Sequence, residues 1–146
     1  MGENIAKLSC IKCTKSVSYN MRNNKEYHLS KQLAQWLRLQ YPDLLYRFDM
    51  AGLNLSKTQA GMNKAIQQSR GYPDLMIFRA NKKYQGAFLE LKTTTPYLKD
   101  GITLKKDEHL EEQAKKHEQL RGEGYWADFT VGFEHSRRVI EQYLKQ

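Results

Sequence analysis

The chain has 146 residues, of which 40% are hydrophobic and 27% charged, and its formal net charge is +8. These values are ordinary for one soluble domain with a modest core. No apolar run approaches the roughly 18 residues of a membrane span. The N-terminus also lacks the apolar segment of a signal peptide, so we expect a cytoplasmic protein.

The positive charge is distributed unevenly along the chain. Residues 1–85 carry 14 Lys and Arg against 5 Asp and Glu, whereas residues 86–146 carry 10 against 11. A basic half of this kind favours a polyanionic partner such as nucleic acid. Charge that serves solubility alone is the alternative.

Residues 1–24 are polar and without hydrophobic periodicity, which predicts a flexible basic arm ahead of a domain spanning residues 25–146. Within this arm, Cys10 and Cys13 form a C-x-x-C motif. A structural zinc site needs four ligands, and the chain has no second cysteine pair. We therefore expect two reduced thiols, with zinc shared between two chains as the alternative.

A helix is predicted to begin at Asn23 or Asn24, which are good N-cap residues, and to end before Pro42. Its apolar stripe is formed by Leu29, Leu33, Trp36 and Leu37. A strand is expected over 44–50, and Ser56 is expected to cap a short helix running to about Ser69. The later elements are predicted as strands at 75–78 and 87–89, a helix at 104–121, a strand at 126–133 and a helix at 136–145.

The two central strands are joined by a short polar connection and read as a hairpin. If it closes symmetrically about residues 82 and 83, Asp74 lies opposite Glu90 or Lys92, and opposed residues point to the same side of a sheet. Glu90 and Lys92 share one face because strand side chains alternate. Two carboxylates and one ammonium would then converge, as needed to hold a divalent cation and activate water against a phosphodiester. Alternatively, Asp74 sits in a plain turn and the other two form an exposed pair worth under about 1 kcal/mol.

These residues resemble the motif of the PD-(D/E)xK nuclease superfamily, and more closely that of its VRR-NUC branch. Pro73-Asp74 matches the first half of the motif and Glu90-x-Lys92 the second. Gln113 on a helix and Gly124-Tyr125 before the last strand follow in the order of that family, and the resemblance extends over residues 26–144. It implies an α/β fold with a restriction-endonuclease-like αβββαβα core, in which helices flank a mixed four-stranded sheet.

The chemistry of the motif assigns roles to its residues. Asp74 and Glu90 are expected to bind Mg²⁺ or Mn²⁺, which are hard cations that prefer oxygen ligands. The resemblance implies the Leu91 carbonyl as a third ligand. Lys92 is expected to orient the attacking water or to stabilise charge on phosphorus, and the sequence does not choose between these roles.

Two further residues are candidates for the site through the resemblance. Glu26 on the first helix is expected to shape the metal site, although a capping box with Asn23 is equally compatible with its position. Gln113 is expected near the catalytic lysine, with a solvent-facing position at the edge of the helix as the alternative. His117, one turn further on, is predicted to be a packed core histidine.

The segment 51–70 is the most polar uncharged stretch of the chain and suits contacts with phosphates and base edges. A solvated surface helix is the alternative. The predicted DNA-binding residues in it are Asn54, Lys57, Lys64, Gln67 and Arg70.

These observations predict a metal-dependent DNA endonuclease. The resemblance to single-domain, phage-type members implies a structure-specific enzyme that acts as a homodimer on branched or Holliday-junction DNA. The alternatives are another restriction or repair nuclease with the same site, an RNA nuclease, and a DNA-binding module that has the fold without the activity.

Overall fold

The computed structural model describes residues 22–49 and 55–146, with the backbone alone at residues 22–24. Cys10, Cys13 and Asn54 lie outside the described residues, as does most of the predicted arm. The elements in chain order are α1 (Arg22–Gln40), β1 (Tyr46–Phe48), α2 (Lys57–Ile66), β2 (Leu75–Ile77), β3 (Ala87–Lys92), α3 (Glu108–Gly122), β4 (Trp126–Val131) and α4 (Gly132–Leu144).

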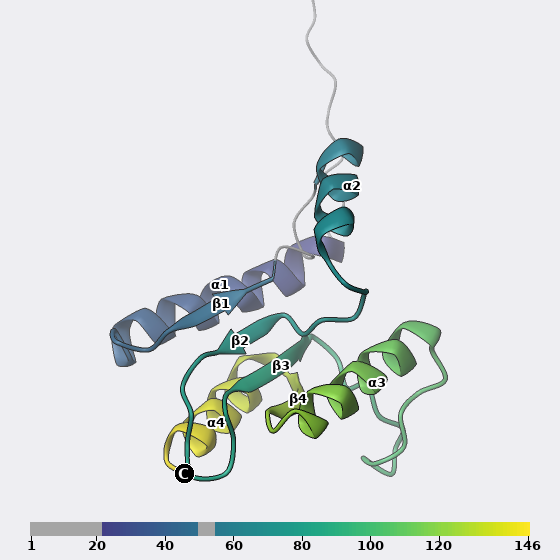
Figure 1. Cartoon of the computed structure of the whole chain (residues 1–146). Helices are drawn as coiled ribbons and strands as arrows, with labels where there is room; N and C mark the ends of the chain where they lie inside the picture. Colours follow the sequence, from purple (N-terminus) through teal and green to yellow (C-terminus); the bar gives the residue numbers. More distant parts are fainter. Residues whose placement is uncertain (1–21, 50–54) are drawn as a thin grey trace, which may run out of the picture.

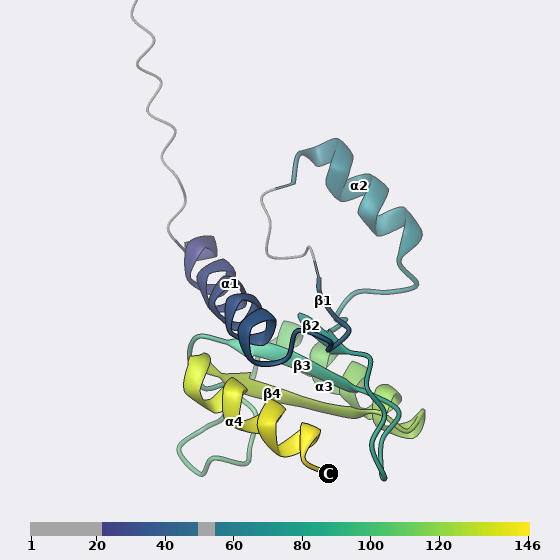
Figure 2. The ribbon, with the colours of Figure 1, turned by 90° about the vertical axis from the view of Figure 1, so that its left-hand side faces the viewer.

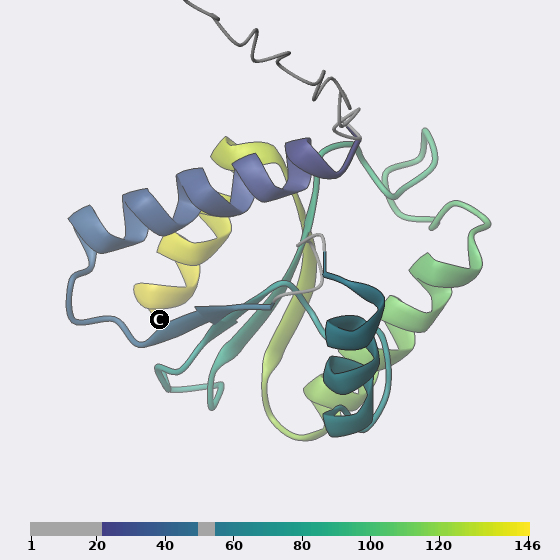
Figure 3. The same ribbon diagram turned by 90° about the horizontal axis from the view of Figure 1, so that it is seen from above.

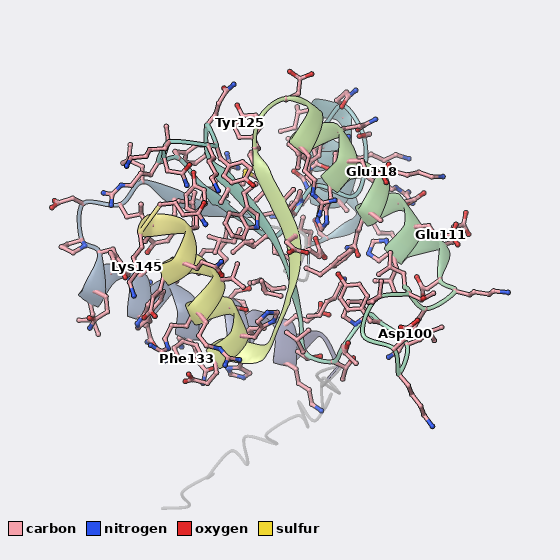
Figure 4. All side chains as sticks on the ribbon, turned by 90° about the horizontal axis from the view of Figure 1, so that it is seen from below. Asp100, Glu111, Glu118, Tyr125, Phe133 and Lys145 are labelled. Atoms are coloured by element: carbon pink, nitrogen blue, oxygen red, sulfur yellow. The ribbon has the colours of Figure 1, made fainter. Side chains whose placement is uncertain are left out.

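A mixed four-stranded sheet in the order β1-β2-β3-β4 forms the centre of the molecule. β1, β2 and β3 pair antiparallel, whereas β3 and β4 pair parallel. α1 and α4 pack against each other on one face of the sheet, and α3 covers the other face (Figure 3). Figure 4 shows α3 and α4 on either side of β4, which runs between Tyr125 and Phe133. This is the α/β architecture predicted from the sequence.

The alternation of β3 separates the core from the charged residues. Ala87, Leu89 and Leu91 are buried in the cluster that contains Leu33 and Leu37 of α1. Glu90 lies between Leu89 and Leu91 in sequence and Lys92 follows Leu91, so both alternate with the buried residues and point to the opposite face, toward α3. The hydrophobic pattern of one strand thus places a carboxylate and an ammonium side by side on the α3 face.

The hairpin forms as predicted, with its centre close to the predicted position at residues 82 and 83. Leu75 pairs with Leu89 and Ile77 with Ala87, which centres the hairpin on residue 82. Gly86 is required where β3 begins, because a Cβ there would lie 2.8 Å from the carbonyl oxygen of Ile77. Continuing this register by one residue sets Asp74 opposite Glu90.

Two predicted element starts are wrong. α1 begins at Arg22, so Asn23 and Asn24 lie inside the helix rather than at its N-cap. α3 begins at Glu108 rather than at residue 104, because the Asp107 carboxylate caps it by accepting the backbone N–H of Leu110 at 3.1 Å.

Two other boundaries also differ from the prediction. β1 is shorter than 44–50, because Leu44 turns into the core ahead of the strand. α4 begins at Gly132, and Ser136 lies within it, where its hydroxyl donates to the Gly132 carbonyl oxygen at 2.7 Å. A serine that bonds back to residue i−4 belongs to a helix interior, so Ser136 does not mark the start.

α2 projects from the body of the molecule (Figures 1 and 2), and none of its residues is buried. Ser56 caps it as predicted: the Ser56 hydroxyl accepts from Gln59 N and the Gln59 side chain accepts from Ser56 N. The helix ends at Ile66, earlier than the predicted Ser69. Within the described ranges 22–49 and 55–146, no helix is long and apolar enough to cross a bilayer.

Candidate active site

Asp74 joins the ends of the two central strands. Its Oδ2 atom accepts the backbone N–H of Leu91 at 2.8 Å, so the carboxylate bonds to the neighbouring strand rather than to its own turn. In an extended strand the N–H and C=O groups of one residue point to the same side. The Leu91 carbonyl therefore also faces the side on which Asp74 lies, where the resemblance expects a third ligand.

Glu90 is the most buried carboxylate of this group, with 3% of its surface exposed. Its Oε1 atom accepts from Lys92 Nζ at 3.0 Å and from Gln113 Nε2 at 2.5 Å. Its Oε2 atom is buried, and as a carboxylate oxygen it accepts no hydrogen bond from the part of the chain that the structure describes. A buried carboxylate oxygen without a partner is costly, and such atoms usually mark a bound ion, water or catalytic role.

Gln113 of α3 connects the acidic and basic groups. Its Oε1 atom accepts from Lys92 Nζ at 2.9 Å, while its Nε2 atom donates to Glu90. An ammonium only donates and a carboxylate only accepts, so the two partners determine the orientation of the amide. Its second Nε2 hydrogen then faces His109 Nε2, 3.2 Å away, which must accept it.

Burial is the largest influence on the two carboxylates. It raises the pKa of Asp74, against the opposing effects of the Leu91 N–H and the Lys92 charge. The pKa of Glu90 is raised to about 8, first by burial and next by the charge of Asp74, while Lys92 acts in the opposite direction. Two carboxyl groups that resist ionising side by side are poised to release protons when a cation binds.

The donor set fits a hard divalent cation. The unpartnered Glu90 Oε2, the Asp74 carboxylate and the Leu91 carbonyl are all oxygen donors, as Mg²⁺ and Mn²⁺ prefer. Among the described residues, no group of three or more His, Cys, Asp and Glu side chains is arranged to hold a metal. Mg²⁺ commonly keeps several waters and needs only one or two carboxylates, so the small donor set at this site is sufficient for it.

A cleft of about 700 Å³ opens onto these groups. One wall is α1, including Glu26, and the other is formed by residues 67–72 together with α3. Glu26 lies close enough for its charge to raise the pKa of Asp74. The structure thus brings Asp74, Glu90, Leu91, Lys92, Gln113 and Glu26 to one cleft.

Only some of the predicted DNA-binding residues lie at the cleft. Gln67 and Arg70 line the cleft. Lys57 and Lys64 are exposed on α2 and do not line it. Asn54 lies outside the described residues.

The wall at residues 67–72 is held against α3 by an unexpected buried lysine. Lys116 Nζ donates to Ser69 Oγ at 2.7 Å and lies 4.6 Å from the centre of the Tyr72 ring. Gly71 adopts a φ of +81°, and a Cβ there would meet the Glu112 carbonyl oxygen at 3.4 Å. These contacts position the backbone next to Arg70 at the mouth of the cleft.

His117, the next residue of α3, is the packed core histidine predicted from the sequence. Its ring centre lies 4.5 Å from that of Phe129, and neither of its ring nitrogens has a partner among the described residues. Burial lowers its pKa to about 4, with further lowering by the charges of Arg121 and Lys92.

Among the residues that line the cleft, sequence reasoning did not single out His109, Lys31 or Arg38. His109 precedes Gln113 by four residues, so the two share a helix face. Lys31 and Arg38 are seven residues apart, a spacing that also returns to one face of a helix. These helical spacings could have indicated all three residues, once Gln113 and the apolar stripe of α1 had been identified.

The element order, the mixed sheet and the paired carboxylates beside a lysine define a restriction-endonuclease-like fold. Among solved structures, the chain is similar to one described as "VRR_NUC domain protein", with a TM-score of 0.59 and 23% sequence identity over 82% of this chain and 88% of that one. The predicted resemblance is therefore confirmed at the level of the fold. No family model matches the chain, and no curated protein does.

Proposed function

We propose that this protein is a metal-dependent DNA endonuclease that hydrolyses phosphodiester bonds. The observation that carries the proposal is the Oε2 atom of Glu90, which is buried and accepts no hydrogen bond from the described residues. Glu90 lies on the same side of the sheet as Asp74, and its Oε1 atom accepts a hydrogen bond from Lys92. The fold shared with a protein named for a VRR_NUC domain supports the same reaction class.

Asp74 and Glu90, with the Leu91 carbonyl, would hold Mg²⁺ or Mn²⁺. When bound, such a cation lowers the pKa of water and withdraws charge from a phosphoryl oxygen. The Leu91 N–H orients Asp74, and Gln113 orients Glu90, so both carboxylates are preorganised by the strands and by α3. This preorganisation favours catalysis because little rearrangement is needed as charge develops.

Lys92 would act on the phosphate or on the attacking water. Two of its three N–H groups are directed to Glu90 and Gln113, at 3.0 and 2.9 Å. One N–H therefore remains for a substrate oxygen. The Lys92 side chain keeps 15% of its surface exposed at the cleft, which allows this contact.

The finer features of the proposal come from the sequence resemblance. They are a preference for branched or Holliday-junction DNA and action as a homodimer. A symmetric junction calls for two cuts, which a dimer with two sites would supply. The cytoplasmic location is likewise an expectation from the sequence.

The test is a panel of linear, flapped and four-way DNA, with matched RNA, incubated with Mg²⁺, Mn²⁺ or EDTA. We expect cleavage of DNA by the wild type only with divalent metal, and retained binding without cleavage in Asp74→Asn. Binding without cleavage of any substrate by the wild type would instead identify a non-catalytic DNA-binding module. Preferential cleavage of RNA would identify a ribonuclease.

A further inference from the structure

α1 presents two different faces along its length. Leu29, Leu33 and Leu37 recur at intervals of four and are buried in the core. A neighbouring face lines the cleft through Tyr27, Ser30, Lys31, Ala34 and Arg38. One side of this helix therefore packs in the hydrophobic core, and the other forms a wall of the candidate active site.

Two cations on the cleft face of α1 lack an acidic partner. Lys31 and Arg38 are exposed, and neither forms an ion pair with any side chain that the structure describes. The only hydrogen bond of Arg38 within the described part of the chain runs from its Nε to the Ala34 carbonyl oxygen, at 3.3 Å. Most of the hydrogen-bonding capacity of these two groups is thus directed to solvent. We refer to Lys31 and Arg38 as the cationic row.

The row leads away from the candidate metal centre. Glu26, one turn before the row, lies near Asp74. With a rise of 1.5 Å per residue, Lys31 is about 7 Å and Arg38 about 18 Å beyond Glu26 along the helix axis. Figure 3 shows α1 running from its purple start, on the side of α3, outward past the sheet. A chain of phosphates leaving the centre along this wall would pass both cations.

We propose that the cationic row binds the backbone phosphates of DNA beside the bond to be cut. This inference rests on the proposed function and adds the surface that guides the substrate. Lys31 and Arg38 are separated by about 10 Å along the helix, and phosphates of one B-DNA strand are spaced about 3.4 Å apart along its axis, so the two contacts fall about three phosphates apart.

The charge balance of the cleft explains why a row is needed. Its acidic side chains are Glu26, Asp49, Asp74 and Glu90, and its basic side chains are Lys31, Arg38, Arg70 and Lys92. When all of these groups are ionised, the four acids offset the four bases, and ionised Asp74 and Glu90 would repel a phosphate. The row extends the contact surface beyond these acids, and divalent metal at the centre removes the remaining repulsion.

The salt dependence of DNA binding tests this assignment. Binding of a fluorescent DNA duplex is measured by anisotropy between 50 and 200 mM salt, in EDTA so that cleavage does not interfere. The variants are Lys31→Gln/Arg38→Gln and the control Lys82→Gln/Lys83→Gln, which removes the same charge from exposed residues of the hairpin connection, outside the cleft. Thermal melting verifies that both variants are folded.

We expect the slope of log Kobs against log salt to become shallower by about 1.8 in the row variant, at about 0.9 per lost phosphate contact. Between 50 and 200 mM salt, the wild type should then lose about twelve-fold more affinity than the row variant does. The control should keep the wild-type slope. Equal slopes in the two double variants would overturn the proposal, and so would tighter binding of an RNA duplex with the same dependence on the row.

This outcome is separable from the test of the proposed function. If the wild type never cuts DNA but the salt slope falls in the row variant, the proposed nuclease activity is refuted, whereas DNA binding by the cationic row is supported. If the wild type cuts DNA but the row variant has the same salt slope, the nuclease activity is supported, whereas DNA binding by the cationic row is refuted.

Discussion

Glu90→Gln is the substitution whose effect on stability follows most directly from the geometry. In the metal-free protein the pKa of Glu90 is raised to about 8 from 4.5, mainly by burial. The folded protein therefore holds a proton that the unfolded chain releases, so stability must fall as pH rises through the window between these values. Glutamine keeps an Oε1 atom to accept from Lys92 and Gln113 but does not ionise.

In the window from pH 6.5 to 8 His117 contributes little, because its pKa is about 4 in the folded protein and an unfolded imidazole, with its ordinary pKa of 6.5, is already at least half deprotonated. One proton corresponds to about 1.4 kcal/mol per pH unit, so Glu90 accounts for a loss of about 2 kcal/mol in the unfolding free energy across this window. Glu90→Gln should remove the part of this pH-dependent loss that is due to Glu90. The variant should therefore be more stable than the wild type at pH 8.

Urea unfolding in EDTA at several pH values measures this difference. Glu118→Gln is the matched control, because Glu118 is an exposed glutamate of α3 (Figure 4) outside the cleft. The control should keep the pH dependence of the wild type. A Glu90→Gln protein that loses as much stability as the wild type between pH 6.5 and 8 would refute the burial argument.

Two further substitutions test neighbouring parts of α3. Gln113→Leu should lower single-turnover cleavage about 10- to 100-fold, because Glu90 and Lys92 lose the amide that orients them, and an unchanged rate would show that the amide is dispensable. His117→Leu should abolish the part of acid destabilisation that comes from protonating a buried imidazole. Because its pKa is lowered to about 4, the contribution of His117 to stability falls by about 3 kcal/mol as pH drops from 6.5 toward 4, opposite in sign to the contribution of Glu90. The difference in unfolding free energy between wild type and variant, measured by urea unfolding, should change by this amount over that range.

Much of the site could be predicted because it depends on strand alternation. The length of the hairpin connection limited the residue opposite Asp74 to Glu90 or Lys92, and the observed register, continued by one residue, selects Glu90. Strand alternation then places Glu90 and Lys92 on one face. The core side of α1 follows in the same way from the periodicity of its leucines.

The rest depended on contacts between segments distant in sequence. Lys116 looks like a solvated helix residue until α3 is seen to pack on residues 67–72, where Ser69 and Tyr72 meet it. Lys31 and Arg38 could be placed on one face of a helix, but not at a cleft wall without the position of α1 relative to the sheet. Helix starts were missed because several polar residues near each boundary are able to cap.

Titration of the metal-free protein with Mn²⁺ at pH 8, followed by electron paramagnetic resonance, tests most directly whether Asp74 and Glu90 share a divalent cation. The wild type should bind Mn²⁺ and release protons as it does so. The variants Asp74→Asn and Glu90→Gln should bind it much more weakly while remaining folded. Mn²⁺ binding of equal affinity in all three proteins would contradict the account.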